Sequence, residues 1–199
     1  MDQGFLHLHK AGLEAKNLAV FRGERLVFKD ISFHLPSGTA LLLRGPNGSG
    51  KSSLLRAVAG LTPLAAGTLL WNGENAFDDL PTHATRLAWL GHQDAVKPAL
   101  TPAEHAPLAA LEAVGLAGYA HLPAKFLSAG QKRRLALARI IASQAPLWLL
   151  DEPTNGLDTA SITQFESHAA AHLATGGQIL ASTHTPLSLP TASTLDLGQ

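Results

Sequence analysis

The strongest constraint in the sequence is the segment Gly45-Pro46-Asn47-Gly48-Ser49-Gly50-Lys51-Ser52, which matches the phosphate-loop pattern G-x-x-x-x-G-K-[ST] in full. An apolar run precedes this segment and a helical pattern follows it. The glycines let backbone N–H groups converge on an anion, and the positive end of the following helix adds to the same point. Lys51 then reaches the β- and γ-phosphates, and Ser52 binds Mg²⁺. The segment therefore predicts a nucleotide site between a strand and a helix.

The rest of the chain alternates short apolar runs with helical patterns. We expect strands at 13–20, 25–34, 39–44, 67–71, 87–90, 147–150 and 178–182, and helices at 52–59, 101–116, 128–143 and 158–173. This alternation predicts an α/β fold with a largely parallel central sheet. The first two strands, joined by a turn at Arg22-Gly23, add an antiparallel β portion. We expect one domain over 1–199, with its core in 1–93 and 144–199 and a short helical subdomain at 94–143.

Composition excludes several other classes of protein. The 15 Lys and Arg residues balance the 15 Asp and Glu residues, so no basic excess indicates a nucleic-acid partner. The chain has no cysteine, which excludes disulfides, thiolate zinc sites, iron–sulfur clusters and a cysteine nucleophile. No apolar run approaches the length that crosses a bilayer, and residues 1–4 lack the pattern of a signal peptide. These features predict a soluble protein of a reducing compartment.

A second chemical centre is predicted where the buried strand at 147–150 ends in Asp151 and Glu152. Ligands of open α/β sheets bind at the carboxyl ends of the strands, so both carboxylates should lie near the phosphate loop. Asp151 can hold Mg²⁺, commonly through water, and Glu152 can polarise an attacking water as a general base.

A third motif is the string Leu127-Ser128-Ala129-Gly130-Gln131, just before a predicted helix. Alone it is weak, because a serine cap at a helix start explains it equally well. Combined with the phosphate loop and Asp151-Glu152, it resembles the ATP-binding subunits of ABC transporters. The likeness covers nearly the whole chain, and the motif order of that family is complete with Gln93 before the string, and Gly156-Leu157-Asp158 and His184 after Glu152.

The resemblance implies ATP and Mg²⁺ as cofactors and assigns a role to each motif residue. Gln93 would contact Mg²⁺ and sense the membrane partner, and His184 would contact the γ-phosphate. Glu152, His184 and Gln93 would be catalytic, and Ser52, Gln93 and Asp151 would hold the metal. The nucleotide would be bound by Gly45, Pro46, Asn47, Gly48, Ser49, Gly50, Lys51, Ser52, Ser53, Ser128, Gly130, Gln131 and Asp158.

The same resemblance implies two kinds of partner. Ser128 and Gly130 would contact the ATP held by a second copy of the chain in a head-to-tail dimer, and Asp158 would couple the two sites. Integral membrane subunits would receive the energy, which implies a peripheral location on the cytoplasmic face of the inner membrane. No nucleic acid is expected.

The sequence departs from the family pattern at three points. In the family, an aromatic residue just before an early turn usually stacks on the adenine. Here Arg22 holds that position and Phe21 precedes it, and the sequence does not decide which of the two would stack on the adenine. Ala129 stands where glycine is commoner, and the helical arm after Gln93 is short.

Local strings narrow the resemblance to the ATP-binding subunits of cytochrome c maturation (haem export) complexes. There are four such strings: Trp71 followed by Asn72-Gly73, the residues 89–93, the residues 115–119, and Leu147-Trp148. The alternatives are a small exporter such as one for lipoprotein release, or a soluble ABC-type ATPase of translation or DNA repair. The latter needs two cassettes or a long coiled-coil insertion, and the chain has neither. An inactive regulator is disfavoured by the presence of Glu152 and His184.

The chain contains ten histidines, and four of them stand out by their spacing or place: His7, His9, His168 and His172. His168 and His172 are spaced as a metal pair on a helix would be. No third ligand accompanies them, so we expect no metal or haem site there.

Overall fold

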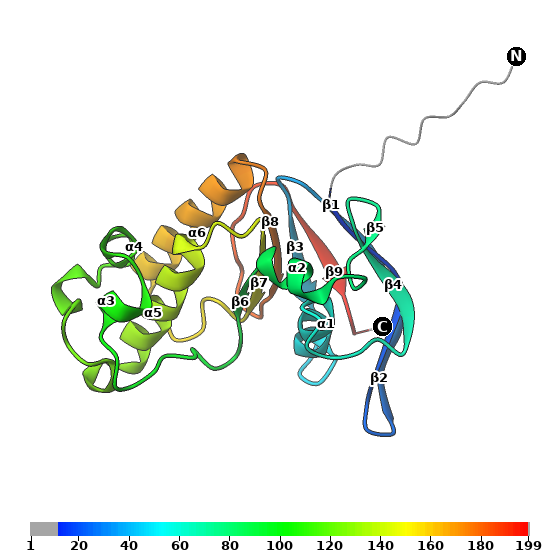
Figure 1. The fold of residues 1–199 in the computed structure, drawn as a ribbon, viewed down its shortest axis with the longest axis horizontal. Coiled ribbons are helices and arrows are strands. Elements are labelled where there is room, and N and C mark those ends of the chain that lie inside the picture. The colour runs from blue at the N-terminus through cyan, green and yellow to red at the C-terminus, as the bar shows by residue number, and fades with distance from the viewer. Residues whose placement is uncertain (1–11, 199) are drawn as a thin grey trace, which may run out of the picture.

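The computed structural model describes residues 12–198 of the chain, and residues 1–4, His7 and His9 lie outside this range. A five-stranded sheet forms the centre of the molecule, in the order β6-β7-β8-β3-β9, with every pairing parallel (Figure 1). The strands are β3 (Ala40–Arg44), β6 (Leu87–Leu90), β7 (Leu147–Asp151), β8 (Gln178–Ser182) and β9 (Ala192–Asp196). The predicted α/β fold with a parallel sheet is confirmed.

Alternation of side chains along these strands divides the core into two layers. Leu41 and Leu43 of β3 face a cluster with α1 (Lys51–Val58) and the antiparallel sheet. Ala40 and Leu42 face the opposite layer, which contains α5 (Ala129–Ala142) and α6 (Thr159–Ala174). Strands covered on both faces read as continuous apolar runs, which is why β3, β7 and β8 are evident in the sequence.

The antiparallel sheet has the strand order β2-β1-β4-β5 and confirms the predicted antiparallel portion. Its strands are β1 (Gly12–Arg22), β2 (Arg25–Pro36), β4 (Ala66–Trp71) and β5 (Glu74–Asn75). Asn72 and Gly73 both have positive φ, at 52° and 88°, as the tight turn between β4 and β5 requires.

The helical arm differs from its prediction. A single helix over 101–116 is wrong, because the segment forms α3 (Pro102–His105) and α4 (Leu108–Glu112). Pro107 has no N–H to continue the helix and holds Ala106 in an extended conformation, with φ −150° and ψ 150°. The start at Thr101 is confirmed, since its N–H and hydroxyl both donate to Glu104 Oε2 at 2.8 Å.

Two 3₁₀ turns, η1 (Ala117–Tyr119) and η2 (Ala124–Phe126), complete the arm before α5. Leu111, Leu116 and Leu135 are fully buried in a separate apolar cluster of the arm. α5 contributes to this cluster and to the core layer beside the sheet, so it joins the arm to the sheet (Figure 1). The boundaries 94–143 for a helical subdomain stay a prediction.

Besides the two 3₁₀ turns, three elements have no counterpart in the predicted set: β5, β9 and α2 (Leu80–Thr85). β9 is a mostly exposed edge strand that pairs only with β3, and its side chains form no apolar run. Within residues 12–198, no helix combines the length and the apolar character that a bilayer crossing demands.

One buried titratable group gives stability a pH dependence. The His83 ring is fully buried on α2, its Nε2 lies 2.8 Å from the Val58 carbonyl oxygen, and its edge faces Phe77. Burial disfavours the charged ring and lowers the pKa of His83 below the usual 6.5. The unfolded chain therefore binds a proton that the folded chain rejects, and stability falls as pH drops below about 6.5.

We predict that the urea midpoint of unfolding is lower at pH 5.5 than at pH 7.5, and that His83→Gln reduces this difference. Glutamine can still donate to the Val58 carbonyl oxygen, but it does not titrate. His172 also has a pKa lowered by burial, so part of the difference should remain in the variant. An unchanged pH difference in His83→Gln would show that His83 is not a source of the effect.

Candidate active site

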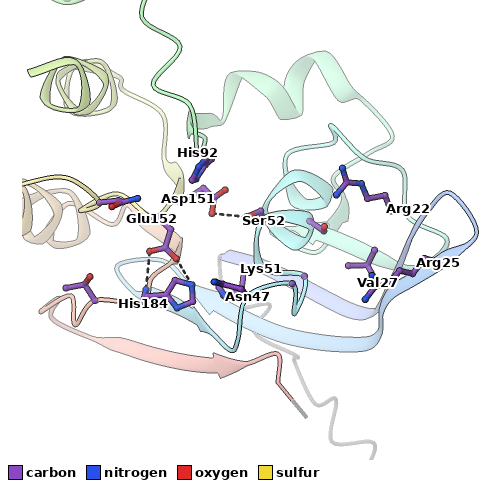
Figure 2. Close-up of a pocket in the computed structure, with 15 residues that line it drawn as sticks. Arg22, Arg25, Val27, Asn47, Lys51, Ser52, His92, Asp151, Glu152 and His184 are labelled. Atoms are coloured by element: carbon purple, nitrogen blue, oxygen red, sulfur yellow. Dashed lines mark hydrogen bonds and ion pairs between the residues drawn. The ribbon is translucent and has the colours of Figure 1, made fainter. Parts of the chain in front are cut away.

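A cavity of about 630 Å³ lies at the carboxyl edge of the parallel sheet (Figure 2). Its walls come from segments far apart in the sequence: the phosphate loop and the start of α1, the ends of β7 and β8, and the hairpin between β1 and β2. A volume of this size suits a small-molecule ligand. Strand order explains the convergence, because β7, β8 and β3 are adjacent and end at one edge.

The phosphate loop has the conformation that its glycines predict. Gly45, Gly48 and Gly50 have φ values of 136°, 82° and 101°, which L side chains rarely adopt. The Lys51 ammonium is folded over the loop and donates to the carbonyl oxygens of Gly45 at 2.7 Å and Pro46 at 3.0 Å. Lys51 is only 7% exposed, so its charge is held close to the loop. An anion in the loop would meet this cation and the N-terminus of α1 together.

Asp151 links the phosphate loop to the sheet. Ser52 Oγ donates to Asp151 Oδ1 at 3.0 Å, and Ser182 Oγ donates to the same oxygen at 2.6 Å. The hydroxyl and the carboxylate are hard oxygen donors of the kind that Mg²⁺ prefers, so Ser52 and Asp151 fit this ion. In the sequence these two residues stand 99 positions apart.

Glu152 is oriented by its backbone and by His184. Its N–H lies 3.0 Å from Ser182 Oγ, and its φ of 50° is unusual for a residue with a side chain. The His184 N–H donates to Glu152 Oε2 at 3.1 Å, and His184 Nε2 lies 3.5 Å from Oε1 (Figure 2). The Glu152 side chain is 18% exposed, so its carboxylate reaches the cavity while its position is restricted.

The structure brings only some of the predicted site residues together. The cavity wall includes Asn47, Gly48, Gly50, Lys51, Ser52, Ser53, Asp151, Glu152 and His184. Gln93 instead lines a separate groove of about 420 Å³ between β6 and α5. The neighbouring His92 faces the cavity, close to Asp151 in Figure 2. The contact of Gln93 with Mg²⁺ therefore stays a prediction, and His92 is a wall residue that sequence reasoning missed.

The residues assigned to a second subunit's nucleotide lie outside this cavity. Ser128 caps α5 by accepting from the Gln131 N–H at 3.2 Å, and Gln131 Oε1 accepts from the Ser128 N–H at 2.8 Å. Asp158 caps α6, and the hydrogen bond from the Ser161 N–H lowers the pKa of its carboxyl. An added Cβ on Gly130 would lie 3.4 Å from the Gly156 carbonyl oxygen, so the two motifs are neighbours.

The structure favours one of the two residues left open for the adenine. Arg22 lines the end of the cavity opposite Asp151, together with Arg25 and Val27, whereas Phe21 is 49% exposed and is not part of the wall (Figure 2). Arg22 and Arg25 face each other across the hairpin of β1 and β2. Arg25 is a second wall residue that sequence reasoning missed, although the predicted turn at Arg22-Gly23 could have indicated that it pairs with Arg22.

His172 is half-buried and packs against the core. Its ring stacks on Trp148 of β7, with centroids 4.0 Å apart and planes 8° from parallel. Within residues 12–198 no group of three or more His, Cys, Asp or Glu side chains is placed to hold a metal ion.

Comparisons with known proteins agree on one family. The family model described as ABC transporter matches residues 28–155. The "Cytochrome c biogenesis ATP-binding export protein CcmA" of Paramagnetospirillum magneticum is 52% identical over 93% of each chain. The protein of the same name from Rhodospirillum rubrum is 50% identical over 92% of this chain and 84% of its own.

Two solved structures extend the comparison to the fold. An ATP-binding subunit of an ABC transporter has a TM-score of 0.80 at 26% identity, covering 87% of this chain and 80% of its own. A dimeric ATP-binding cassette bound to ADP and phosphate has a TM-score of 0.75 at 23% identity, covering 87% and 88%. At this identity the second likeness concerns the fold alone.

We predict that Arg22→Ala weakens ATP binding while Phe21→Ala does not. A guanidinium stacked on a base contributes about 0.5–2 kcal/mol, so the Kd for ATP should rise about 2- to 30-fold in Arg22→Ala. Calorimetric titration with ATP and with inorganic tripolyphosphate separates the base from the phosphates. An equal loss of affinity for tripolyphosphate, or an equal effect of Phe21→Ala, would contradict this assignment.

Proposed function

The chain belongs to the ABC transporter family, and from that premise we propose that it is the ATP-binding and ATP-hydrolysing subunit of an export complex for cytochrome c biogenesis. The structural observation that carries the proposal is the Ser52–Asp151 hydrogen bond, which joins the phosphate loop to the strand end that bears Glu152. The relatives named for cytochrome c biogenesis match 89% or more of this chain at 44–52% identity. They favour this role over lipoprotein release or a soluble ABC-type ATPase.

The phosphates of ATP would bind over the loop at 45–52. Lys51 would exchange its bonds to the Gly45 and Pro46 carbonyl oxygens for phosphate oxygens, which are stronger acceptors. Ser52 and Asp151 would hold Mg²⁺, which neutralises charge on the β- and γ-phosphates when bound. Ser182 would keep the Asp151 carboxylate in place through its 2.6 Å hydrogen bond.

Hydrolysis would use Glu152 as the general base. Its carboxylate accepts a proton from a water molecule as the water oxygen attacks the γ-phosphorus, and the bond from that phosphorus to the bridging oxygen of ADP breaks. The products are ADP and inorganic phosphate. The hydrogen bond from the His184 N–H restricts the carboxylate, and the His184 ring, which lines the same cavity, would contact the γ-phosphate.

Two copies of the chain would complete each site. Ser128, Gly130 and Asp158 lie outside the cavity of their own chain, which supports a head-to-tail arrangement in which they serve the second copy's ATP. The chain would lie peripherally on the cytoplasmic face of the inner membrane, and integral membrane subunits would receive the energy. The exposed groove that contains Gln93 is open to such a partner.

We predict that Glu152→Gln retains ATP binding and loses hydrolysis, because the amide cannot accept the proton. Loss of a general base lowers kcat by about 10²- to 10⁴-fold. With Mg-ATP the variant should accumulate as a dimer of doubled mass in light scattering. The matched control is Glu112→Gln, an exposed glutamate on α4, which should hydrolyse ATP normally. A monomeric Glu152→Gln that hydrolyses ATP at the wild-type rate would refute both the base and the dimer.

The biological role is tested in a strain whose only copy carries Glu152→Gln. Growth on a fermentable substrate should be normal, and haem staining of c-type cytochromes should disappear because ATP hydrolysis is needed for covalent haem attachment. Glu112→Gln should restore staining. Normal staining with Glu152→Gln would reject the assignment to cytochrome c biogenesis and leave the ATPase chemistry intact.

A further inference from the structure

Arg133 of α5 has an environment that the functional assignments above leave unused. It is 5% exposed, and its guanidinium donates to two separate segments, the end of β7 and the loop at 91–94. Nε donates to the Pro153 carbonyl oxygen at 3.2 Å, and Nη2 donates to the carbonyl oxygens of Asp151, at 2.9 Å, and Glu152. Nη1 donates to Asp94 Oδ1 at 2.8 Å and to the Gly91 carbonyl oxygen at 3.3 Å.

The first consequence concerns the backbone around Glu152. Three consecutive carbonyl oxygens, at 151–153, accept from one planar guanidinium at the point where β7 leaves the sheet. Glu152 has a φ of 50° there, a strained conformation for a residue with a side chain that persists only where the surroundings hold it. The rigid fork of an arginine suits this task, because its donors are fixed relative to one another and its charge does not titrate.

The second consequence concerns the loop between β6 and α3. A buried cation needs a partner, and the Asp94 carboxylate supplies one at 2.8 Å. This ion pair holds the loop at 91–94, in which His92 faces the cavity and Gln93 faces the groove beside β6. Asp94 and Arg133 also line a cleft of about 210 Å³ that reaches Glu152.

The third consequence concerns α5 itself. Arg133 lies on the second turn of the helix that begins after the Ser128 cap. Any displacement of α5 relative to β7 must therefore either break the hydrogen bonds from Arg133 to the carbonyl oxygens at 151–153 or move those carbonyl groups. Since Glu152 is one of those residues, its carboxylate depends on where α5 lies.

We propose that Arg133 is a positioning residue for ATP hydrolysis: it holds the backbone at 151–153 so that the Glu152 carboxylate stays on the His184 N–H, and it links that position to α5 and to the loop at 91–94. The inference rests on the proposed function, since it concerns the same general base. Arg133 lies outside the nucleotide cavity, so it acts through Glu152 and not on the phosphates.

The test compares Arg133→Gln and Arg133→Lys in the full chain, assembled with the membrane subunits that the proposed function implies. We expect Arg133→Gln to lower kcat about 10- to 100-fold, as displacement of a catalytic group by about 1 Å does, with the KM for ATP within about threefold. Arg133→Lys retains the charge beside Asp94 but not the fork, and should recover part of kcat. If Arg133→Gln does not fold, the kcat of Arg133→Lys relative to the wild type tests the inference instead.

A control is Arg56→Gln. Arg56 is an exposed residue in the last turn of α1, and it lines neither the nucleotide cavity, the groove that contains Gln93 nor the cleft beside Glu152. Its loss should leave kcat within about twofold, because exposed side chains of this kind contribute little.

A double-variant cycle separates positioning from general stability. If Arg133 acts through Glu152, then adding Arg133→Gln to Glu152→Gln should lower the residual rate by less than about threefold. Wild-type kcat in Arg133→Gln, or the full loss repeated in the Glu152→Gln background, would overturn the inference while the ATPase assignment stands. A wild-type complex that hydrolyses no ATP would overturn the proposed function and the inference with it.

Discussion

The site depends on two hydrogen bonds to one carboxylate oxygen. Asp151 Oδ1 accepts from Ser52 at the start of α1 and from Ser182 at the end of β8. These bonds are possible because β7 and β8 are adjacent parallel strands and β3, which leads into the phosphate loop, lies beside β8. The apolar layers on both faces of the sheet hold this order, and the polar chemistry is confined to the edge where the strands end.

Three charges are buried at this edge, and each is compensated differently. Lys51 is held by loop carbonyl oxygens, which leaves its charge available for an anion. Asp151 is held by hydroxyl groups, which leaves its charge available for a cation. Arg133 is compensated by Asp94 and four carbonyl oxygens, so its charge is used entirely within the protein. The first two arrangements suit ligand binding, and the third suits the placement of a backbone.

The hydrogen bonds around Glu152 connect the segment that follows β8 to α5. Glu152 contacts His184, which follows β8, on one side and, through its carbonyl oxygen, Arg133 from α5 on the other. Two consecutive residues of the loop at 91–94 line different hollows: His92 lines the cavity, and Gln93 lines the groove between β6 and α5. His92 and Gln93 are adjacent in the chain, so the cavity and the groove share one loop as part of their walls.

Features set by neighbouring residues could be derived from the sequence alone. The phosphate loop, the apolar strands β3, β7 and β8, and the caps at Thr101, Ser128 and Asp158 depend on local spacing, and local spacing is what a sequence displays. The predicted helix over 101–116 is wrong for a local reason as well, since Pro107 interrupts the segment although the Ala and Leu periodicity continues on both sides of it. The rest was decided by tertiary structure. The exposed strand β9 forms because the edge of β3 is free to pair with it. Arg22 rather than Phe21 lines the cavity because of how the β1–β2 hairpin lies against the phosphate loop. Arg133 bonds to the carbonyl oxygens at 151–153 because α5 packs beside β7. None of these partners is close in sequence, so only folding brings the groups within hydrogen-bonding distance.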